Sequence, residues 1–395
     1  MTSVLTEPAL TRPALLTGGD GGLDDHLTQH GRLPLLDGSQ IVGLARDAAL
    51  TGRGGAGFPM WRKLGAVAAA GGPAVVIANG AEGEPVSGKD RTLLTRRPHL
   101  VLDGLHLVAL ATGARAAHLY APAALLPRLR EALAARRAAG LDKLPVTLTA
   151  APDAFVSGEE SAVASAIAGR GAAPADKRIR VVDTGTLVQN VETLAHLALI
   201  ARYGPGWFLS SGTFLATVSG AVVRPSVVEA GYGVPLGDLI AAAGGATEQV
   251  QAVLVGGYHG GWVPADPALP VSREALAPFG ASPGAGVVVA LPAHACGLAE
   301  TAKIAEYLAG QVAGQCGPCV NGLPRMAGTL ADLAAGRPRP GLPGEAARLA
   351  ALVTGRGACR HPDGTARLVL SAMRAFEADV AAHLNGRCLA TGGRL

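Results

Sequence analysis

Short apolar runs alternate with longer helical patterns, rich in alanine and leucine, between residues 21 and 208. Strands are expected at 74–78, 117–120 and 146–150, and helices at 100–112 and 122–137. Strands that alternate with helices form parallel sheets covered by helices, because each parallel connection needs a long crossover. The sequence therefore predicts an α/β domain over residues 21–208.

The rest of the chain changes character twice. Residues 209–288 carry short β-rich pieces at 213–219 and 253–255 around one helical pattern at 236–243, which favours a compact α+β domain. Residues 289–385 are helical, with helices expected at 300–312, 327–335, 345–354 and 366–383. Residues 1–20 are expected to be a flexible N-terminus, and residues 386–395 a tail.

The composition is that of a globular protein. With 395 residues and 49% hydrophobic content, the chain is long enough to bury several cores. A net charge of only +4 and 4% aromatic residues argue against nucleic-acid binding. The sequence has no run as long and apolar as a membrane span and no basic segment followed by an apolar core at its start, so we expect a cytoplasmic protein.

A glycine-rich loop with the sequence GRGGAGFP occupies residues 52–59. Four glycines in six positions let a backbone approach a flat or anionic ligand without obstruction by Cβ atoms. By itself such a loop is more often a tight surface turn than a cofactor cradle.

Three further polar motifs follow this loop in order. They are NGAEGEP at 79–85, directly after an expected strand and followed by KDR at 89–91, then GEE at 158–160 and QNVET at 189–193. Polar groups at the carboxyl end of a strand are where α/β folds bind ligands, and helix N-termini suit anions and polar ligand edges. An isolated glutamate in such a motif is more often a solvated charge or a helix cap. Together the four motifs favour a ligand pocket.

The four motifs, in this order, resemble the NADH- and FMN-binding flavin subunit of respiratory complex I and its relatives in NAD-reducing hydrogenases and formate dehydrogenases. The resemblance implies a Rossmann-like flavin domain, a β-grasp (ubiquitin-like) soluble-ligand-binding domain over 209–288 and a C-terminal helical bundle that holds an iron–sulfur cluster. It implies that cofactors are bound by Gly52, Arg53, Gly54, Gly55, Gly57, Phe58, Lys63, Asn79, Glu82, Glu84, Gly158, Glu159, Glu160, Lys177, Asn190 and Thr193. Phe58, Glu84 and Glu160 would lie on the nucleotide side.

Two departures from the family pattern affect the expected NADH site. Ala81 stands where the family usually has an aspartate. The family also places several phenylalanines around the adenine of NADH, and here only Phe58 is present, the others falling on Ala66 and on 178–181. Base–aromatic stacking contributes roughly 1–3 kcal/mol per contact, so NADH is a less secure expectation than FMN.

The cysteines indicate metal or redox chemistry. The segment GQCGPC at 314–319, with Cys359 forty residues later, resembles the family's iron–sulfur motif and assigns Cys316, Cys319 and Cys359 to a [4Fe-4S] cluster. Ala313 replaces the fourth ligand. The sequence leaves three alternatives: a cluster completed by Cys296, Cys388, His361 or solvent, a smaller or labile centre, or a lost cluster with three buried thiols.

The expected function is therefore that of an oxidoreductase of the NADH dehydrogenase type. A hydride would pass from NADH to FMN, and electrons would leave singly through the iron–sulfur centre to ferredoxin or a quinone-reducing complex, or flow in reverse. No side-chain nucleophile or base is required, and any membrane association would be peripheral, through a partner. The alternative is a non-catalytic assembly subunit that has kept the fold but lost full cofactor function, which Ala81, Ala313 and the missing aromatics favour.

Overall fold

The computed structural model describes residues 4–5, 14–19, 21–176, 178–337, 339 and 341–394. Most of the expected flexible N-terminus lies outside these ranges. The chain divides into two compact units, one formed by 6–215 with 229–231 and the other by 1–5, 216–228 and 232–395. Among the described residues, no helix is both long and apolar enough to cross a membrane.

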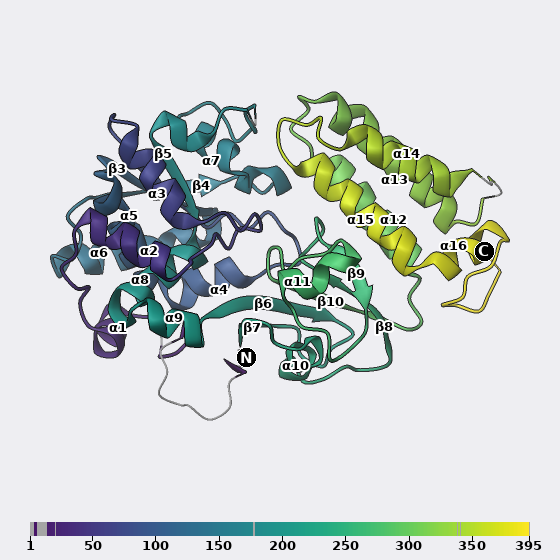
Figure 1. The fold of residues 1–395 in the computed structure, drawn as a ribbon, viewed down its shortest axis with the longest axis horizontal. Coiled ribbons are helices and arrows are strands. Elements are labelled where there is room, and N and C mark those ends of the chain that lie inside the picture. The colour runs from purple at the N-terminus through teal and green to yellow at the C-terminus, as the bar shows by residue number, and fades with distance from the viewer. Residues whose placement is uncertain are drawn as a thin grey trace. The chain divides into compact units, whose positions relative to one another are not determined.

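The first unit is built on a four-stranded parallel sheet (Figure 1). Its strands are β2 (Val75–Asn79), β3 (Ala116–Pro122), β4 (Val146–Ala151) and β5 (Thr186–Asn190), in the order β4-β3-β2-β5. Its helices are α1 (Leu23–His30), α2 (Gly38–Asp47), α3 (Met60–Ala69), α4 (Lys89–Arg96), α5 (Pro98–Thr112), α6 (Leu126–Ala138), α7 (Glu160–Ile167), α8 (Val191–Tyr203) and α9 (Pro205–Ser211). This confirms the predicted α/β alternation, with each predicted strand within two residues of its observed bounds.

Helices α5 and α8 pack against each other at backbone distance. Gly104 in α5 makes this possible, because a Cβ atom at that position would lie 2.0 Å from the carbonyl oxygen of Leu194 in α8. Both helices are apolar over most of their surface and are almost wholly buried. The pair therefore forms the central helical layer of this unit.

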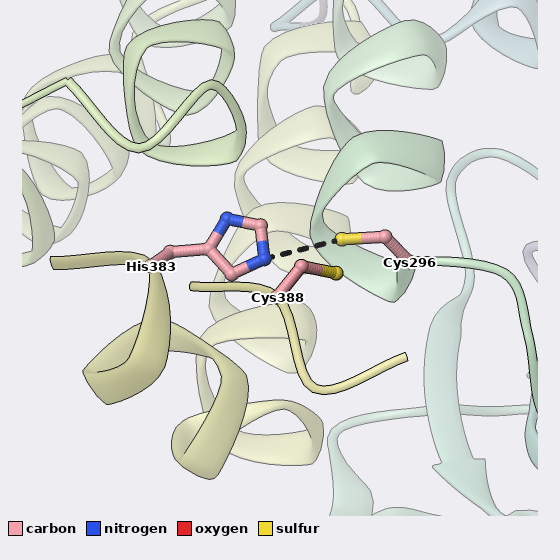
Figure 2. Close-up of side chains that lie close together, drawn as sticks. All are labelled: Cys296, His383 and Cys388. Atoms are coloured by element: carbon pink, nitrogen blue, oxygen red, sulfur yellow. Dashed lines mark hydrogen bonds between the residues drawn. The ribbon is translucent and has the colours of Figure 1, made fainter. Parts of the chain in front are cut away.

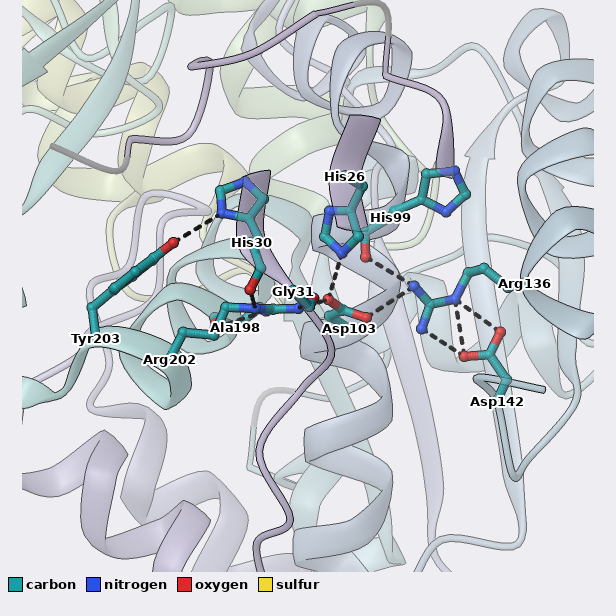
Figure 3. Close-up of polar contacts among 10 residues, drawn as sticks. All are labelled: His26, His30, Gly31, His99, Asp103, Arg136, Asp142, Ala198, Arg202 and Tyr203. Atoms are coloured by element: carbon teal, nitrogen blue, oxygen red, sulfur yellow. Dashed lines mark hydrogen bonds and ion pairs between the residues drawn. The ribbon is translucent and has the colours of Figure 1, made fainter. Parts of the chain in front are cut away.

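A buried charge network ties α1, α5, α6 and α8 together (Figure 3). The carboxylate of Asp103 contacts His26 Nε2 at 2.8 Å and Arg136 at 2.9 Å, and it also pairs with Arg202. Burial alone would raise the pKa of Asp103, but these partners hold it well below its usual range. Asp103 is therefore ionised and compensates two buried guanidinium groups.

The second unit begins with a mixed sheet in the order β1-β7-β6-β10-β8-β9. Its strands are β1 (Val4–Leu5), β6 (Thr213–Gly220), β7 (Ser226–Gly231), β8 (Val250–Val255), β9 (Gly261–Pro264) and β10 (Val287–Pro292), with helices α10 (Leu236–Ala242) and α11 (Arg273–Leu276). Strand β10 is parallel to β6 and antiparallel to β8. The predicted strands at 213–219 and 253–255 and the helix at 236–243 are all present.

A bundle of helices completes the second unit. It consists of α12 (Gly297–Gly310), α13 (Leu323–Ala334), α14 (Leu342–Val353), α15 (His361–Ala375) and α16 (Glu377–Leu384). The single helix predicted at 366–383 is wrong in one respect, because Phe376 leaves helical geometry at φ −116° and separates α15 from α16. The Phe376 ring packs edge-on against Trp262, with ring centroids 5.3 Å apart.

Gly104→Ala should destabilise the protein by about 1–3 kcal/mol, because the added methyl group overlaps the backbone of α8, which cannot move without repacking the layer. Gly43→Ala in α2 is the matched control, since its Cβ would meet nothing within 4 Å, and it should stabilise by about 0.5–1 kcal/mol. Chemical denaturation measures both changes. Equal effects of the two substitutions would contradict the close contact of α5 and α8.

Asp103→Asn should cost about 3–5 kcal/mol, because it leaves the buried cations Arg136 and Arg202 without their shared counter-charge. Asp47→Asn, which removes an exposed ion pair with Arg46, should change the free energy of unfolding by less than about 0.5 kcal/mol. A small effect at Asp103, measured in the same denaturation experiment, would show that the network is dispensable.

Candidate functional site

Two asparagines stand side by side at the carboxyl edge of the parallel sheet. Asn79 ends β2, Asn190 ends β5, and the two residues are paired in the strand register. The side chain of Asn79 donates to the carbonyl of Gly158 at 2.9 Å and accepts from the amide of Ala81 at 3.1 Å. Parallel α/β sheets bind ligands at this edge, and the predicted motifs at 79–85, 158–160 and 189–193 meet here.

The glycine loop is closed by the pairing of Thr51 with Pro59 and by a hydrogen bond from Gly52 N to Phe58 O at 2.9 Å. Gly55 and Gly57 have φ of 99° and 63°, which side chains disfavour. These values explain why glycine is needed at both positions.

The loop lies against the start of α8. The amide of Arg53 donates to the Thr193 hydroxyl at 2.9 Å, and a Cβ at Gly54 would lie 3.6 Å from the Cβ of Asn190. Predicted site residues from distant parts of the sequence are thereby brought into one place.

The surroundings of this loop fit the polar edge of a flavin ring. An added Cβ at Gly52 or Gly54 would meet nothing closer than 3.6 Å, so the backbone there is open to a ligand. The neighbour of Gly52 is Gln189, whose buried Oε1 accepts no hydrogen bond from any described residue. A buried acceptor without a donor is costly, and a flavin ring edge offers both N–H donors and carbonyl acceptors.

A buried cation holds this edge together. Lys89 is 3% exposed, and its ammonium group contacts Asp90 at 2.6 Å, Glu192 at 2.9 Å and the Asn190 side chain at 3.4 Å. Asn190 in turn donates to Asp90 at 2.8 Å. Sequence reasoning noted the KDR motif but gave Lys89 no role; two charges in one motif beside an apolar helix were the available signal.

Charges within this network shift the affinities for protons. Burial alone would lower the pKa of Lys89, but the carboxylates of Asp90 and Glu192 raise it above its usual value. Burial would raise the pKa of Glu192, but Lys89 and the contact with His196 lower it to about 2. Lys89 and Glu192 are therefore both charged at neutral pH, and their pair anchors α4 to α8.

The predicted acidic residues have different local roles. Glu82 accepts from the amides of Asp90 at 3.0 Å and Arg91 at 3.3 Å, so it caps α4. Glu159 caps α7 by accepting from the amides of Ser161 and Ala162. These contacts occupy both side chains with framework hydrogen bonds, a role that the spacing alone did not distinguish from ligand binding.

The remaining predicted residues frame the same region. Lys63 in α3 pairs with Glu160, the first residue of α7, at 2.8 Å and donates to the carbonyl of Val188 at 3.3 Å. Phe58 is 46% exposed. Glu84 lies in the loop that follows β2, and Lys177 lies outside the described residues.

The predicted iron ligands gather beyond the end of α12. Cys316 precedes a π-helical turn, η5 (Pro318–Gly322), which contains Cys319, and the amide of Ala358 donates to the Cys316 sulfur at 3.4 Å. Burial raises the pKa of Cys319 to about 12, with the nearby Cys359 and Cys316 contributing to the rise. Thiolates packed this closely require a cation, as an iron–sulfur cluster provides.

The structure rules out three of the proposed fourth ligands. Cys296 caps the N-terminus of α12, whereas Cys316 follows its C-terminus, and a helix of 14 residues is about 21 Å long. Cys388 lies beside Cys296. Both ring nitrogens of His361 are engaged, with His259 Nε2 at 3.1 Å and the carbonyl of Leu308 at 2.9 Å.

Family models match three parts of the chain. Residues 45–199 match the Nuo51 FMN-binding domain, residues 215–260 the SLBB domain and residues 299–383 the iron-sulfur binding region of NADH-ubiquinone oxidoreductase F. The first match covers the glycine loop and both asparagines. The third covers Cys316, Cys319 and Cys359.

Whole-chain relatives agree with these matches. The chain is 30% identical to the second of the numbered F subunits of NADH-quinone oxidoreductase in Rhizobium meliloti, over 88% of its own length and 89% of that protein. It is 27% identical to the corresponding F subunit of Streptomyces coelicolor, over 88% and 83%. An H2-reduced NAD+-reducing [NiFe]-hydrogenase structure superposes with a TM-score of 0.81 at 32% identity, over 88% of this chain but only 63% of that chain. These matches confirm the predicted family, fold class, FMN, NADH and iron–sulfur cofactors, and NADH oxidoreductase function.

Gly54→Leu should abolish flavin binding without unfolding the chain, because the position is open in the protein itself but faces the predicted ring. We expect the affinity for FMN to fall at least about tenfold, or ~1.4 kcal/mol. Gly65→Leu on the exposed surface of α3 is the control and should bind FMN normally. FMN titration by fluorescence quenching measures both, and unchanged binding in Gly54→Leu would place the flavin elsewhere.

Proposed function

Because this chain belongs to the family of NADH-quinone oxidoreductase F subunits, we propose that its glycine loop, the ends of β2 and β5 and the start of α7 together hold FMN. Gly52, Gly54, Asn79, Gly158, Asn190 and Thr193 line this pocket, and Lys63, Glu159 and Lys177 complete it. The observation that carries the proposal is the convergence of the four motifs at one sheet edge. When bound, FMN supplies hydride acceptance and one-electron release.

The residues of the chain bind and orient the flavin and perform no acid–base step. Gln189 and Asn190 offer amide groups to the ring edge, beside glycines that leave the backbone accessible. Lys63 is 17% exposed and paired with Glu160, so it presents positive charge at the mouth of the site without being fully screened by solvent. The pocket is thus preorganised by the framework around it.

The nucleotide side is less complete. Phe58 offers a half-exposed ring for stacking, and Glu84 and Glu160 lie near the same loop region. Ala66 and Arg178 to Val181 provide no aromatic ring. We expect NADH to bind more weakly than in relatives that have two more phenylalanines, by roughly 1–3 kcal/mol for each lost contact.

The electrons leave through the helical bundle. Cys316, Cys319 and Cys359 hold the iron–sulfur cluster, and a non-cysteine ligand takes the position that Ala313 leaves vacant. The acceptor is an electron-transfer protein, such as ferredoxin or a quinone-reducing subunit, in the cytoplasm. Two of the relatives are named as F subunits of NADH-quinone oxidoreductase, which supports a partner of this kind.

Anaerobic titration with NADH tests this proposal. The purified full chain should bleach its flavin absorption, and Cys316→Ser should lose most of its iron while its flavin still bleaches, because hydride transfer needs only the flavin site. Cys388→Ser should keep its iron, because Cys388 lies at the opposite end of α12 from Cys316.

Two results would contradict the proposal in different ways. A folded chain without flavin or iron, even after reconstitution, would establish the cofactor-poor assembly subunit that Ala81 and Ala313 favour. Flavin that is reduced by a ferredoxin but not by NADH would reject NADH as the donor.

A further inference from the structure

Three metal-binding side chains meet at the end of the helical bundle that lies away from the iron–sulfur motif (Figure 2). Cys296 caps α12, His383 is near the end of α16, and Cys388 lies in the C-terminal tail. One donor atom from each lies within 4.8 Å of the other two, and His383 and Cys388 are buried. Their positions in the sequence, far apart and without a compact motif, concealed this cluster.

The spacing of the donors is that of a mononuclear tetrahedral site. Cys296 Sγ and His383 Nε2 are 3.5 Å apart. A zinc ion with Zn–S of about 2.3 Å and Zn–N of about 2.0–2.1 Å requires an S···N separation of about 3.6 Å at tetrahedral angles. The two side chains therefore already stand at the distance that one shared ion would impose.

The histidine is oriented as a metal ligand. His383 Nδ1 donates to the carbonyl of Leu333 at 3.1 Å, so the proton is on Nδ1 and the lone pair of Nε2 faces Cys296. Metal-ligating histidines almost always donate their other ring N–H to such an acceptor. The backbone of α13 thus fixes both the tautomer and the direction of the ring.

Backbone geometry brings the cysteines to the histidine. Gly386, with φ of 65°, ends α16 in a left-handed turn in which its amide bonds to His383 O and the amide of Arg387 bonds to Ala382 O. This turn folds the chain back, and the amide of Cys388 donates to Gly393 O at 3.1 Å. Cys296 sits at the positive end of the α12 dipole, which favours a thiolate.

A buried carboxylate adds negative charge to the same helix face. Asp379 lies one turn before His383 in α16, is 8% exposed, and its Oδ1 accepts no hydrogen bond from any described residue. An uncompensated buried carboxylate oxygen is unfavourable unless a cation or a water molecule is near. The face of α16 that carries His383 therefore favours positive charge.

We propose that Cys296, His383 and Cys388 bind a single zinc ion, with water in the fourth position, and that this ion fastens residues 386–394 to α12. Two thiolates and one imidazole form a soft ligand set that zinc prefers to the oxygen-loving cations. Three donors grouped around one point suit a single ion rather than a second four-iron cluster. The site is separate from the predicted iron ligands and does not depend on the proposed electron-transfer function.

Metal analysis of the purified full chain tests the proposal. We expect about one zinc per chain after incubation with zinc and desalting, and a reduction of at least about tenfold in Cys388→Ser and in His383→Gln. Cys316→Ser, matched in chemistry but placed at the opposite end of α12, should lose iron and keep zinc. This pairing separates the zinc site from the iron–sulfur site within one measurement.

Cobalt substitution of the unmodified chain provides a test that does not require any variant to fold. Co²⁺ should give a thiolate-to-cobalt charge-transfer band and an intense tetrahedral visible band, both abolished by one equivalent of zinc. An intact mass two hydrogens lighter, with Cys296 and Cys388 resistant to alkylation, would overturn the proposal in favour of a disulfide. Absence of both zinc and cobalt binding in reduced, folded protein would also overturn it.

Discussion

The ion pair between Lys89 and Glu192 is the interaction on which the flavin-binding edge depends. It joins the first residue of α4 to the first turn of α8, with both groups almost completely buried and 2.9 Å apart. Removing one member of such a pair costs far more than the pair contributes, because the other charge is left in a low-dielectric interior. Asn190, which lies between them through its bonds to Lys89 and Asp90, is held in the orientation that the site requires.

Rigidity at this edge is combined with openness above it. Asn79, Asn190 and Glu82 satisfy backbone and side-chain groups of the framework, whereas the backbone at Gly52 and Gly54 meets no near neighbour. A cofactor that must accept hydride and release electrons gains from a site that does not reorganise during the reaction. The structure therefore separates residues that hold the pocket from residues that leave room for the ligand.

Local sequence signals predicted much of this arrangement. The apolar runs that became β2, β3 and β4 are bounded by turns and separated by helical patterns, so their strand identity follows from nearby residues. The break at Phe376 was not predictable in this way, because it accompanies packing against Trp262, more than a hundred residues earlier. Glu82 was predicted as a ligand-side residue, although its acceptance of the α4 amides is equally compatible with the motif. The meeting of Cys296 with His383 and Cys388 depends on how the bundle closes, which no short window of sequence contains.

FMN titration of Lys89→Met against Lys303→Met most directly tests whether the buried network organises the flavin site. Lys303 forms an exposed ion pair with Glu300, so its loss removes a charge from the surface without disturbing a buried group. We predict that Lys303→Met binds FMN like the unmodified chain, and that Lys89→Met, where circular dichroism shows retained secondary structure, binds it at least about tenfold more weakly. Equal affinity of the two variants for FMN would contradict the central role of Lys89.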